Sequence, residues 1–291
     1  MENIKIKKVN NYMALLRNLR NISRAGVSEE HLDKVAAALV HQPAIENSKQ
    51  LPFRFYSAYK QLRMANSDFR LIKATEKAME LSIANLPRLE GNVASLCDNS
   101  GSAHGTFTSS AGTVSVAEIA NLTAVLTGMI TNGNASVFPF GSRLMQYDIN
   151  QSRGVFDQLN EVTQEARRVG QSDETGIWTF WHNAIAQKQH WDNVFVYSDM
   201  QAGHGKLYAR KGIDVLPTHQ WSSSSHSKYI NVAAMINDYR EQVNPDVHVF
   251  LVQVAGYDDS ILPEIYDKTY IIGGWSDAIL KFANKMTVLN P

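Results

Sequence analysis

The sequence is short of cysteine and of long apolar runs. Cys97 is the single cysteine in 291 residues, so an internal disulfide is excluded, and its place inside an apolar run is typical of core packing. No apolar stretch approaches the roughly 18 residues that a transmembrane helix requires. Residues 1–8 (MENIKIKK) also lack the apolar core of a signal peptide. We therefore expect a cytoplasmic protein that has no membrane partner.

Motifs for catalysis are missing as well. The nine histidines include no His-x₃-His or His-Glu pair suited to zinc. Residues 222–226 (SSSSH) lack the Gly-x-Ser-x-Gly turn of a nucleophile elbow, and residues 203–206 (GHGK) are too short for a phosphate-binding loop. Because no base is paired with a nucleophile, the sequence favours a binding protein over an enzyme.

The overall composition is that of a globular protein, with 44% hydrophobic and 19% charged residues. A net charge of zero conceals an asymmetry between the two parts of the chain. Residues 1–90 hold 15 Lys and Arg against 9 Asp and Glu, and the remainder holds 13 against 19. The basic part favours nucleic acid and the acidic part favours metal ions, although the bias is mild.

The first part of the chain, residues 1–88, is predicted to be helical. Apolar residues recur at helical spacing in four segments, and Gly26, Pro43 and Pro52 separate the first three. The expected helices cover residues 13–22, 28–40, a segment from residue 52, and 68–84. Short helices in succession are typical of a small all-α helical-repeat layer.

Pro87 and Gly91 mark a change of pattern, after which strands and helices alternate over residues 89–291. The expected strands are 92–98, 135–140, 193–198, 247–254 and 269–272. The expected helices are 115–131, 155–169, 176–188, 227–242 and 275–286. This alternation predicts an α/β domain with a doubly wound, mostly parallel sheet. Its long connections, 99–114 and 200–226, leave the carboxyl ends of strands, where such folds bind ligands.

Oxygen-bearing side chains follow two of these strands. Asp98, Ser100 and Ser102 come after the apolar run at 93–97, and Asp199 ends the strand at 193–198. Such oxygens are hard ligands, suited to Mg²⁺, Ca²⁺ or Mn²⁺ rather than to zinc or copper. We expect Mg²⁺, with Ca²⁺ or Mn²⁺ as alternatives. If the two strands are neighbours in the sheet, the carboxylates lie side by side. Without an ion, the same residues can form a helix cap or an Asx-type turn.

The pattern Asp98-x-Ser100-x-Ser102, followed by Thr175 and Asp199, resembles the metal-ion-dependent adhesion site of von Willebrand factor A domains. The flanking segments are similar to Ro RNA-binding proteins, in which a TROVE helical-repeat module precedes such a domain. The segments that carry this resemblance are 13–21 (MALLRNLRN), 52–59 (PFRFYSAY), 85–91 (NLPRLEG), 254–257 (VAGY) and 272–277 (IGGWSD).

The resemblance implies a von Willebrand factor A-like, Rossmann-like fold for residues 89–291. It also implies that Ser100, Ser102 and Thr175 are hydroxyl ligands, with Asp98 and Asp199 close to the ion and partly acting through water. A carboxylate from a protein partner would take the open coordination position. The family binds noncoding or structured RNA through its helical module, of which residues 1–88 correspond to about the last quarter.

Basic side chains in the helical segment are the remaining candidates for RNA contacts. Arg17, Arg20 and Arg24 share one helical face, preceded by Lys5, Lys7 and Lys8, and the following helices carry Arg54, Lys60 and Arg63. A solvated basic face is the simpler interpretation of the same pattern. A second function also stays open: a metal-dependent protein-interaction or structural module of a larger assembly, with no RNA role of its own.

Overall fold

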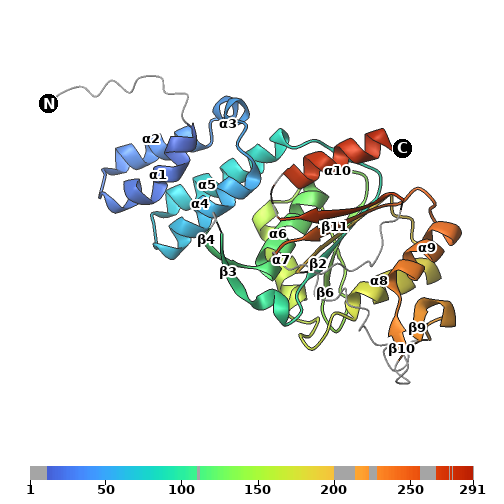
Figure 1. Cartoon of the computed structure of the whole chain (residues 1–291). Helices are drawn as coiled ribbons and strands as arrows, with labels where there is room; N and C mark the ends of the chain where they lie inside the picture. Colours follow the sequence, from blue (N-terminus) through green and yellow to red (C-terminus); the bar gives the residue numbers. More distant parts are fainter. Residues whose placement is uncertain are drawn as a thin grey trace. The chain divides into compact units, whose positions relative to one another are not determined.

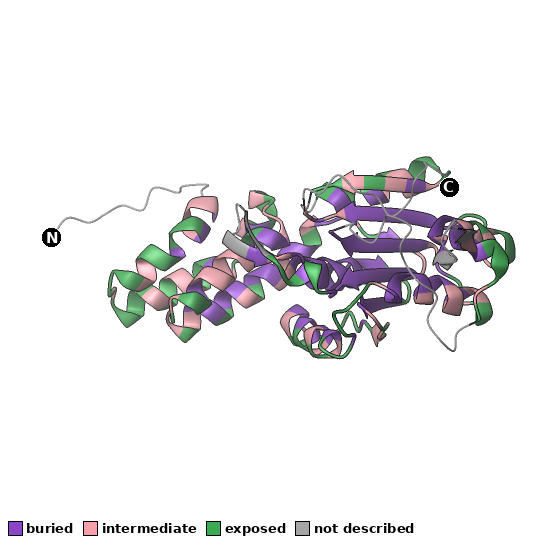
Figure 2. Cartoon of the chain, turned by 60° about the horizontal axis from the view of Figure 1, so that its bottom comes forward, coloured by how far each residue is buried: buried purple, intermediate pink, exposed green. Residues whose placement is uncertain are grey.

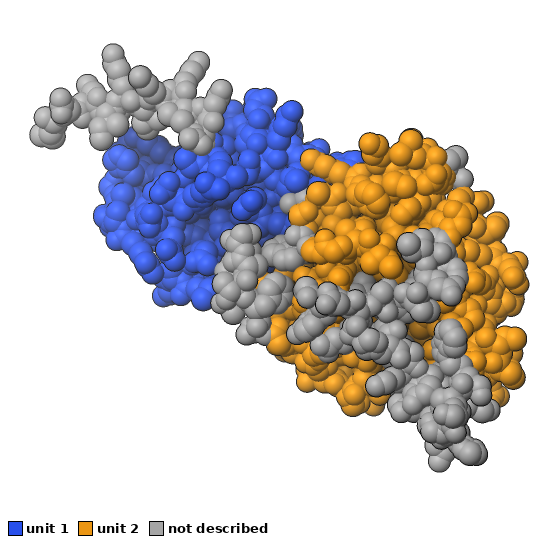
Figure 3. All heavy atoms as spheres, viewed as in Figure 1, with its two compact units in different colours: residues 1–87, 110–112 blue, residues 88–109, 113–291 orange. Residues whose placement is uncertain are grey.

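The computed structural model describes residues 12–109, 112–199, 214–222, 228–255, 267–274, 276 and 278–290. Contacts within the chain divide it into two compact units, coloured separately in Figure 3. Unit 1 comprises residues 1–87 and 110–112, and unit 2 comprises residues 88–109 and 113–291. Each unit has its own buried core, and the two are described separately below.

Unit 1 is helical, as the sequence predicts. Its helices are α1 (Tyr12–Arg24), α2 (Glu29–Leu39), α3 (Gln42–Ser48), α4 (Pro52–Met64) and α5 (Phe69–Ser82), followed by a 3-10 turn, η1 (Ile83–Asn85). Helix α3 was not predicted, because Pro43 indicated only the end of the preceding helix. Pro43 instead lies in the first turn of α3, where proline is tolerated since the backbone N–H there has no partner within the helix.

The core of unit 1 is formed by apolar side chains from all five helices. Leu39 and Ile45 from α2 and α3 are fully buried, and so are Phe55 from α4 and Leu71 from α5. Tyr12 of α1 packs its ring 5.9 Å from that of Phe55 and donates a hydrogen bond from its hydroxyl to the backbone carbonyl of Leu39 on α2. These contacts join α1, α2 and α4 into one packed layer.

Unit 2 is built on a six-stranded sheet with the order β12-β11-β8-β2-β6-β7. Its strands are β2 (Val93–Asp98), β6 (Ala135–Phe140), β7 (Tyr147–Asp148), β8 (Asn193–Ser198), β11 (His248–Gln253) and β12 (Thr269–Gly273). All neighbouring pairs are parallel except β6 and β7. The predicted fold class, a doubly wound and mostly parallel sheet after a small helical segment, is confirmed.

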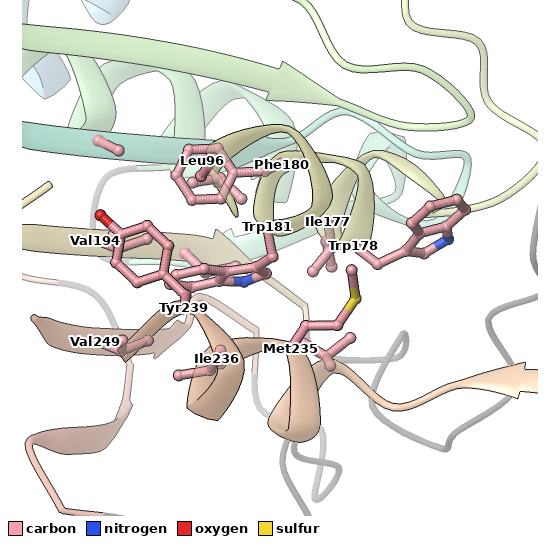
Figure 4. Close-up of a cluster of buried hydrophobic side chains, with 14 of the residues drawn as sticks. Leu96, Ile177, Trp178, Phe180, Trp181, Val194, Met235, Ile236, Tyr239 and Val249 are labelled. Carbon is pink, nitrogen blue, oxygen red and sulfur yellow. The ribbon is translucent and has the colours of Figure 1, made fainter. Parts of the chain in front are cut away.

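Helices cover both faces of this sheet (Figure 1). They are α6 (Val116–Met129), α7 (Val155–Ala166), α8 (Gly176–Ala186), α9 (Val232–Gln242) and α10 (Ala278–Leu289). Leu96, Val194 and Val249 from three strands pack against side chains of α8 and α9, including Trp181 and Ile236 (Figure 4). On the other face, α6 contacts β2, β6 and β8. The central strands are therefore buried throughout, as Figure 2 shows.

Short elements in the connections differ from the predictions. The predicted connection 99–114 contains two strands, β3 (Thr106–Ser109) and β4 (Gly112–Ser115), which pair with each other. The helix predicted from residue 227 begins only at Val232, because Asn231 caps it by accepting a hydrogen bond from the backbone N–H of Ala234 (3.0 Å). The residues just before it form β10 (Lys228–Ile230), which pairs with β9 (Gln220–Ser222). Another short pair, β1 (Leu89–Glu90) and β5 (Thr131–Asn132), is parallel.

Candidate metal site

The two carboxylates singled out from the sequence lie at the same edge of the sheet. Strands β2 and β8 are parallel neighbours in which Cys97 pairs with Tyr197. The next residues along the two strands are Asp98 and Ser198, and Asp199 follows directly. Asp98 and Asp199 are 0% and 1% exposed. The condition on which the metal hypothesis depended, that these strands are neighbours, is met.

Asp98 is held in place through both of its carboxylate oxygens. Its Oδ1 accepts a hydrogen bond from the backbone N–H of Ser100 at 2.9 Å, and its Oδ2 accepts one from the Ser198 hydroxyl at 2.6 Å. The first bond closes an Asx-type turn, so this alternative interpretation of the motif is realised in the fold. The turn keeps Ser100 beside Asp98.

The two serine hydroxyl groups of the motif lie next to each other, and Thr175 begins the helix that follows the facing turn. The Oγ atoms of Ser100 and Ser102 are 3.2 Å apart. Ser100 is buried and Ser102 is exposed, so the second hydroxyl is on the solvent side. Thr175 is 7% exposed at the start of α8, and its side chain makes no capping hydrogen bond to that helix. Its hydroxyl is therefore not committed to the helix.

Three loops of unit 2 are tied together around these residues. The backbone N–H of Gly101 donates to the carbonyl of Gln171 (3.1 Å), and that of Gly176 donates to the carbonyl of Gly141 (2.8 Å). A Cβ atom at Gly101 would lie 2.8 Å from the Gln171 carbonyl oxygen. The Asp98 loop and the turn before α8 thus approach each other more closely than a larger residue at position 101 would allow.

Negative charge is concentrated here. Burial, together with the nearby Asp199 carboxylate, raises the pKa of Asp98 to about 6, although hydrogen bonds from Ser198 and Ser100 oppose the shift. Burial and the carboxylates of Asp98 and Asp199 raise the pKa of Glu174 to about 7. Sequence reasoning missed Glu174, because nothing in its polar turn distinguishes it from Asp173.

The donor set fits a hard divalent cation. Two carboxylates and three hydroxyls are the oxygen ligands that Mg²⁺, Ca²⁺ and Mn²⁺ accept. A cation would also relieve the repulsion between the buried carboxylates. In the part of the chain that the structure describes, no three His, Cys, Asp or Glu side chains converge as a metal-binding group. An ion at this position would therefore depend on hydroxyl ligands and water in addition to Asp98 and Asp199.

The basic residues predicted for RNA contacts lie on α1 and α4 of unit 1. Arg17, Arg20 and Arg24 are exposed on one face of α1, and the Arg20 guanidinium donates to the Gln61 side chain of α4 at 3.2 Å. On α4, Arg54 and Arg63 are exposed and Lys60 is half-buried. The Arg20–Gln61 hydrogen bond brings the α1 face next to α4.

Several of the sequence motifs fall outside the described residues. These are Lys5, Lys7 and Lys8, and residues 203–206 and 223–226. Two of the segments that resemble Ro proteins also lie partly outside: Gly256 and Tyr257 of 254–257, and Trp275 and Asp277 of 272–277.

None of the helices that the structure describes is both long enough and apolar enough to pass through a lipid bilayer.

Comparison with known proteins connects the N-terminal segment to one domain family. Residues 5–88 match the TROVE domain. Over 59 residues the chain is 39% identical to telomerase protein component 1 of Rattus norvegicus and 37% identical to that of Mus musculus. Each match covers 20% of this chain and only 2% of the relative.

A solved structure matches nearly the whole chain. The crystal structure of the Deinococcus radiodurans RO (RSR) protein superposes with a TM-score of 0.64 at 16% sequence identity. The alignment covers 94% of this chain and 52% of that one, so the chain spans about half the length of the protein whose fold it shares. Together with the TROVE match, this confirms the resemblance to the Ro family that the motifs indicated.

Proposed function

From the premise that residues 5–88 belong to the TROVE family and that the chain has the fold of a Ro protein, we propose an RNA-associated, non-enzymatic binding function. In this proposal, unit 1 contacts noncoding or structured RNA. Unit 2 holds a divalent metal ion, Mg²⁺ in the first instance, which binds an acidic group of a protein partner.

One observation carries the metal part of the proposal. The Asp98 carboxylate is fully buried at the end of β2, beside Asp199 at the end of β8, in a neighbourhood that also holds the hydroxyls of Ser100 and Ser198. Burying carboxylates together is costly unless a cation or hydrogen bonds compensate. Two carboxylates roughly neutralise a divalent ion, while neutral hydroxyls and waters leave it able to attract one more anionic ligand.

Titration with Mg²⁺ tests this proposal directly. We expect isothermal titration to detect binding to the parent chain, and Asp98→Ala and Asp199→Ala each to abolish it. Asp157→Ala provides a matched control, because Asp157 is an exposed carboxylate on α7 of the same unit. The melting temperature of the parent should rise with Mg²⁺ concentration, since a ligand that binds only the folded state stabilises it. Equal binding by the parent and both site variants would contradict the assignment.

The RNA part is tested by filter binding of the full chain to structured RNA across a salt series. Contacts to phosphates predict that affinity falls steeply as salt increases. Absence of binding even at low salt would rule out an RNA role for this chain.

The extent of the match favours one alternative function. The chain covers 52% of the Ro structure, and its helical unit holds five α-helices in the described residues. A metal-dependent protein-interaction or structural module of a larger assembly needs only unit 2. Mg²⁺ binding without RNA binding would support this alternative.

A further inference from the structure

Helix α6 contains a buried amide that its own helix does not satisfy. Thirteen of the fourteen residues of α6 are buried, and three of these are polar: Asn121, Thr123 and Thr127. The two threonines donate their hydroxyl hydrogens to carbonyls one turn earlier, those of Ile119 and Thr123, each at 2.7 Å. Asn121 has no such bond among the described contacts, and its side chain reaches out of the helix instead.

The partner of Asn121 is Asn99, which lies in the candidate metal loop, residues 98–102. The Asn99 amide nitrogen donates to the Asn121 side-chain oxygen at 2.8 Å, and the Asn121 nitrogen donates back to Asn99 at 3.1 Å. Both side chains are buried, at 2% and 4% exposure. Buried amides are stable only when they are hydrogen-bonded, so each of these residues depends on the other.

Further contacts fix the backbone on either side of Asn99. Its amide nitrogen also donates to the Cys97 carbonyl at 3.1 Å, and its backbone N–H donates to the Phe140 carbonyl of β6 at 2.8 Å. Asn99 stands between Asp98 and Ser100 in the chain. Asp98 bonds to Ser198 on β8, whereas Asn99 bonds to α6, so neighbouring side chains of the loop are anchored to different elements.

We propose that Asn121 is a positioning residue for the metal loop: through Asn99 it fixes the backbone at 98–100, and with it the direction of the Asp98 carboxylate and the Ser100 hydroxyl. The expected effect of Asn121 on metal affinity rests on the proposed function, whereas its effect on the order of the loop does not. Groups that orient ligands in this way typically change metal affinity by about 10- to 100-fold when they are removed.

The test uses Asn121→Thr in the full chain. A threonine at this position can bond to the Ala117 carbonyl one turn earlier, as Thr123 and Thr127 bond within the same helix, so the helix stays satisfied while the link to Asn99 is lost. Asn121→Leu is the second variant, in case the first folds poorly. Thr123→Val is the matched control, because Thr123 is similarly buried on α6 and the side-chain hydrogen bond that it makes among the described residues stays within its helix.

Two readouts separate positioning from simple loss of stability. The first is amide hydrogen exchange of the metal-free protein at Ser100 and Gly101, whose N–H groups bond to Asp98 and Gln171. The second is the Kd for Mg²⁺. We expect both Asn121 variants to exchange about 10-fold faster at these amides and to bind Mg²⁺ about 10-fold more weakly. Thr123→Val should change neither, even where its melting temperature falls.

Exchange and affinity within twofold of the parent in both Asn121 variants would overturn the inference. If the parent itself does not bind Mg²⁺, the proposed metal function fails, and the exchange measurement alone decides whether Asn121 orders the loop. Faster exchange with unchanged affinity would contradict the metal half of the proposal.

Discussion

The negative charge of Asp98 is unfavourable in the metal-free protein and favourable when a cation is bound. Without a cation its charge is buried beside Asp199, and its pKa of about 6 records that cost. With a cation the same charge becomes a favourable ligand. A substitution that removes the charge but keeps the shape should therefore have effects of opposite sign on the two forms.

For Asp98→Asn we expect the metal-free protein to become more stable at pH 7.5, by on the order of 2 kcal/mol, because the buried charge is removed. The side-chain oxygen can still accept from the Ser100 N–H, and the amide nitrogen can donate to Ser198. The Mg²⁺-dependent rise in melting temperature should disappear. Differential scanning calorimetry in EDTA measures the stability of the metal-free protein, and the same measurement with Mg²⁺ gives the rise in melting temperature. Asp157→Asn is the control, because Asp157 is exposed. A metal-free variant less stable than the parent would contradict this account.

Some residues of the site were predictable from the sequence and others were not. Asp98, Ser100 and Asp199 follow apolar strands, so their place at the sheet edge follows from the strand pattern alone. Asn121 lies inside an apolar helix 22 residues after Asn99, and only the packing of α6 on β2 brings the two together. Glu174 is one residue of a polar turn, and nothing in that turn distinguishes it from Asp173.

At the scale of elements, buried strands were the most predictable parts. β6 and β8 have the bounds expected from their apolar runs, because a strand buried on both faces reads as continuous apolar sequence. The pairs β3–β4 and β9–β10 were missed, since short strands in a connection have too few residues for an alternating pattern. The start of a helix differs from the predicted start by a few residues where a side chain caps it, as Asn231 does for α9.

A histidine on the sheet packs among aromatic rings of the neighbouring strands β11 and β12, and its burial leads to a prediction about pH. His248 of β11 is buried and stacks beside both Phe250 and Tyr270, with ring centroids 6.1 and 5.9 Å away, while those two rings stack on each other at 4.9 Å. Burial lowers the pKa of His248, and the positive charges of Lys268 and Arg240 add to this effect, against opposing contributions from the Asn290 backbone and Asp246. The folded state therefore binds a proton less readily than the unfolded state.

The stability that neutral His248 contributes to the folded state is fully present above the pKa of histidine in the unfolded state, about 6.5. It is lost as the pH falls below that value, because the unfolded state then binds a proton more readily. Asp98 and Glu174, whose pKa values are raised to about 6 and about 7, take up protons over the same range and act in the opposite direction, so the contribution of His248 is measured as a difference between two proteins. Between pH 7.5 and pH 5.5 we expect the melting temperature of the parent to fall relative to that of His248→Phe, which keeps the stacked ring. Circular dichroism melts of both proteins at the two pH values provide the measurement. An equal change of melting temperature in both proteins would show that His248 does not contribute.

At the scale of the whole molecule, the two candidate functions belong to separate compact units. The arginines of α1 are in unit 1, and Asp98 and Asp199 are in unit 2. Each activity can therefore be removed by substitution while the other is measured in the same protein. This makes the two proposals independently testable in the full chain.

For RNA, we expect the double variant Arg17→Gln and Arg24→Gln to bind structured RNA more weakly and with a shallower salt dependence. Each lost phosphate contact should reduce the slope of log K against log salt by about 0.7 to 0.9. Lys34→Gln is the control, because Lys34 on α2 is already paired with Glu30 at 2.6 Å. An unchanged slope in the arginine variant would assign these side chains to a solvated surface. Mg²⁺ binding should be unaffected.

The register of β2 against β8 also determines which changes of chain length the protein can tolerate. Side chains alternate between the two faces of a strand, so one residue inserted within 93–98 would turn Asp98 away from Ser198 while leaving an apolar strand that still fits the sheet. An insertion in the sequence between β3 and β4 would leave that register intact. Homologues that keep both Asp98 and Asp199 should therefore differ in length only in their loops. Homologues with an insertion or deletion inside β2 or β8 should have lost this pair of carboxylates.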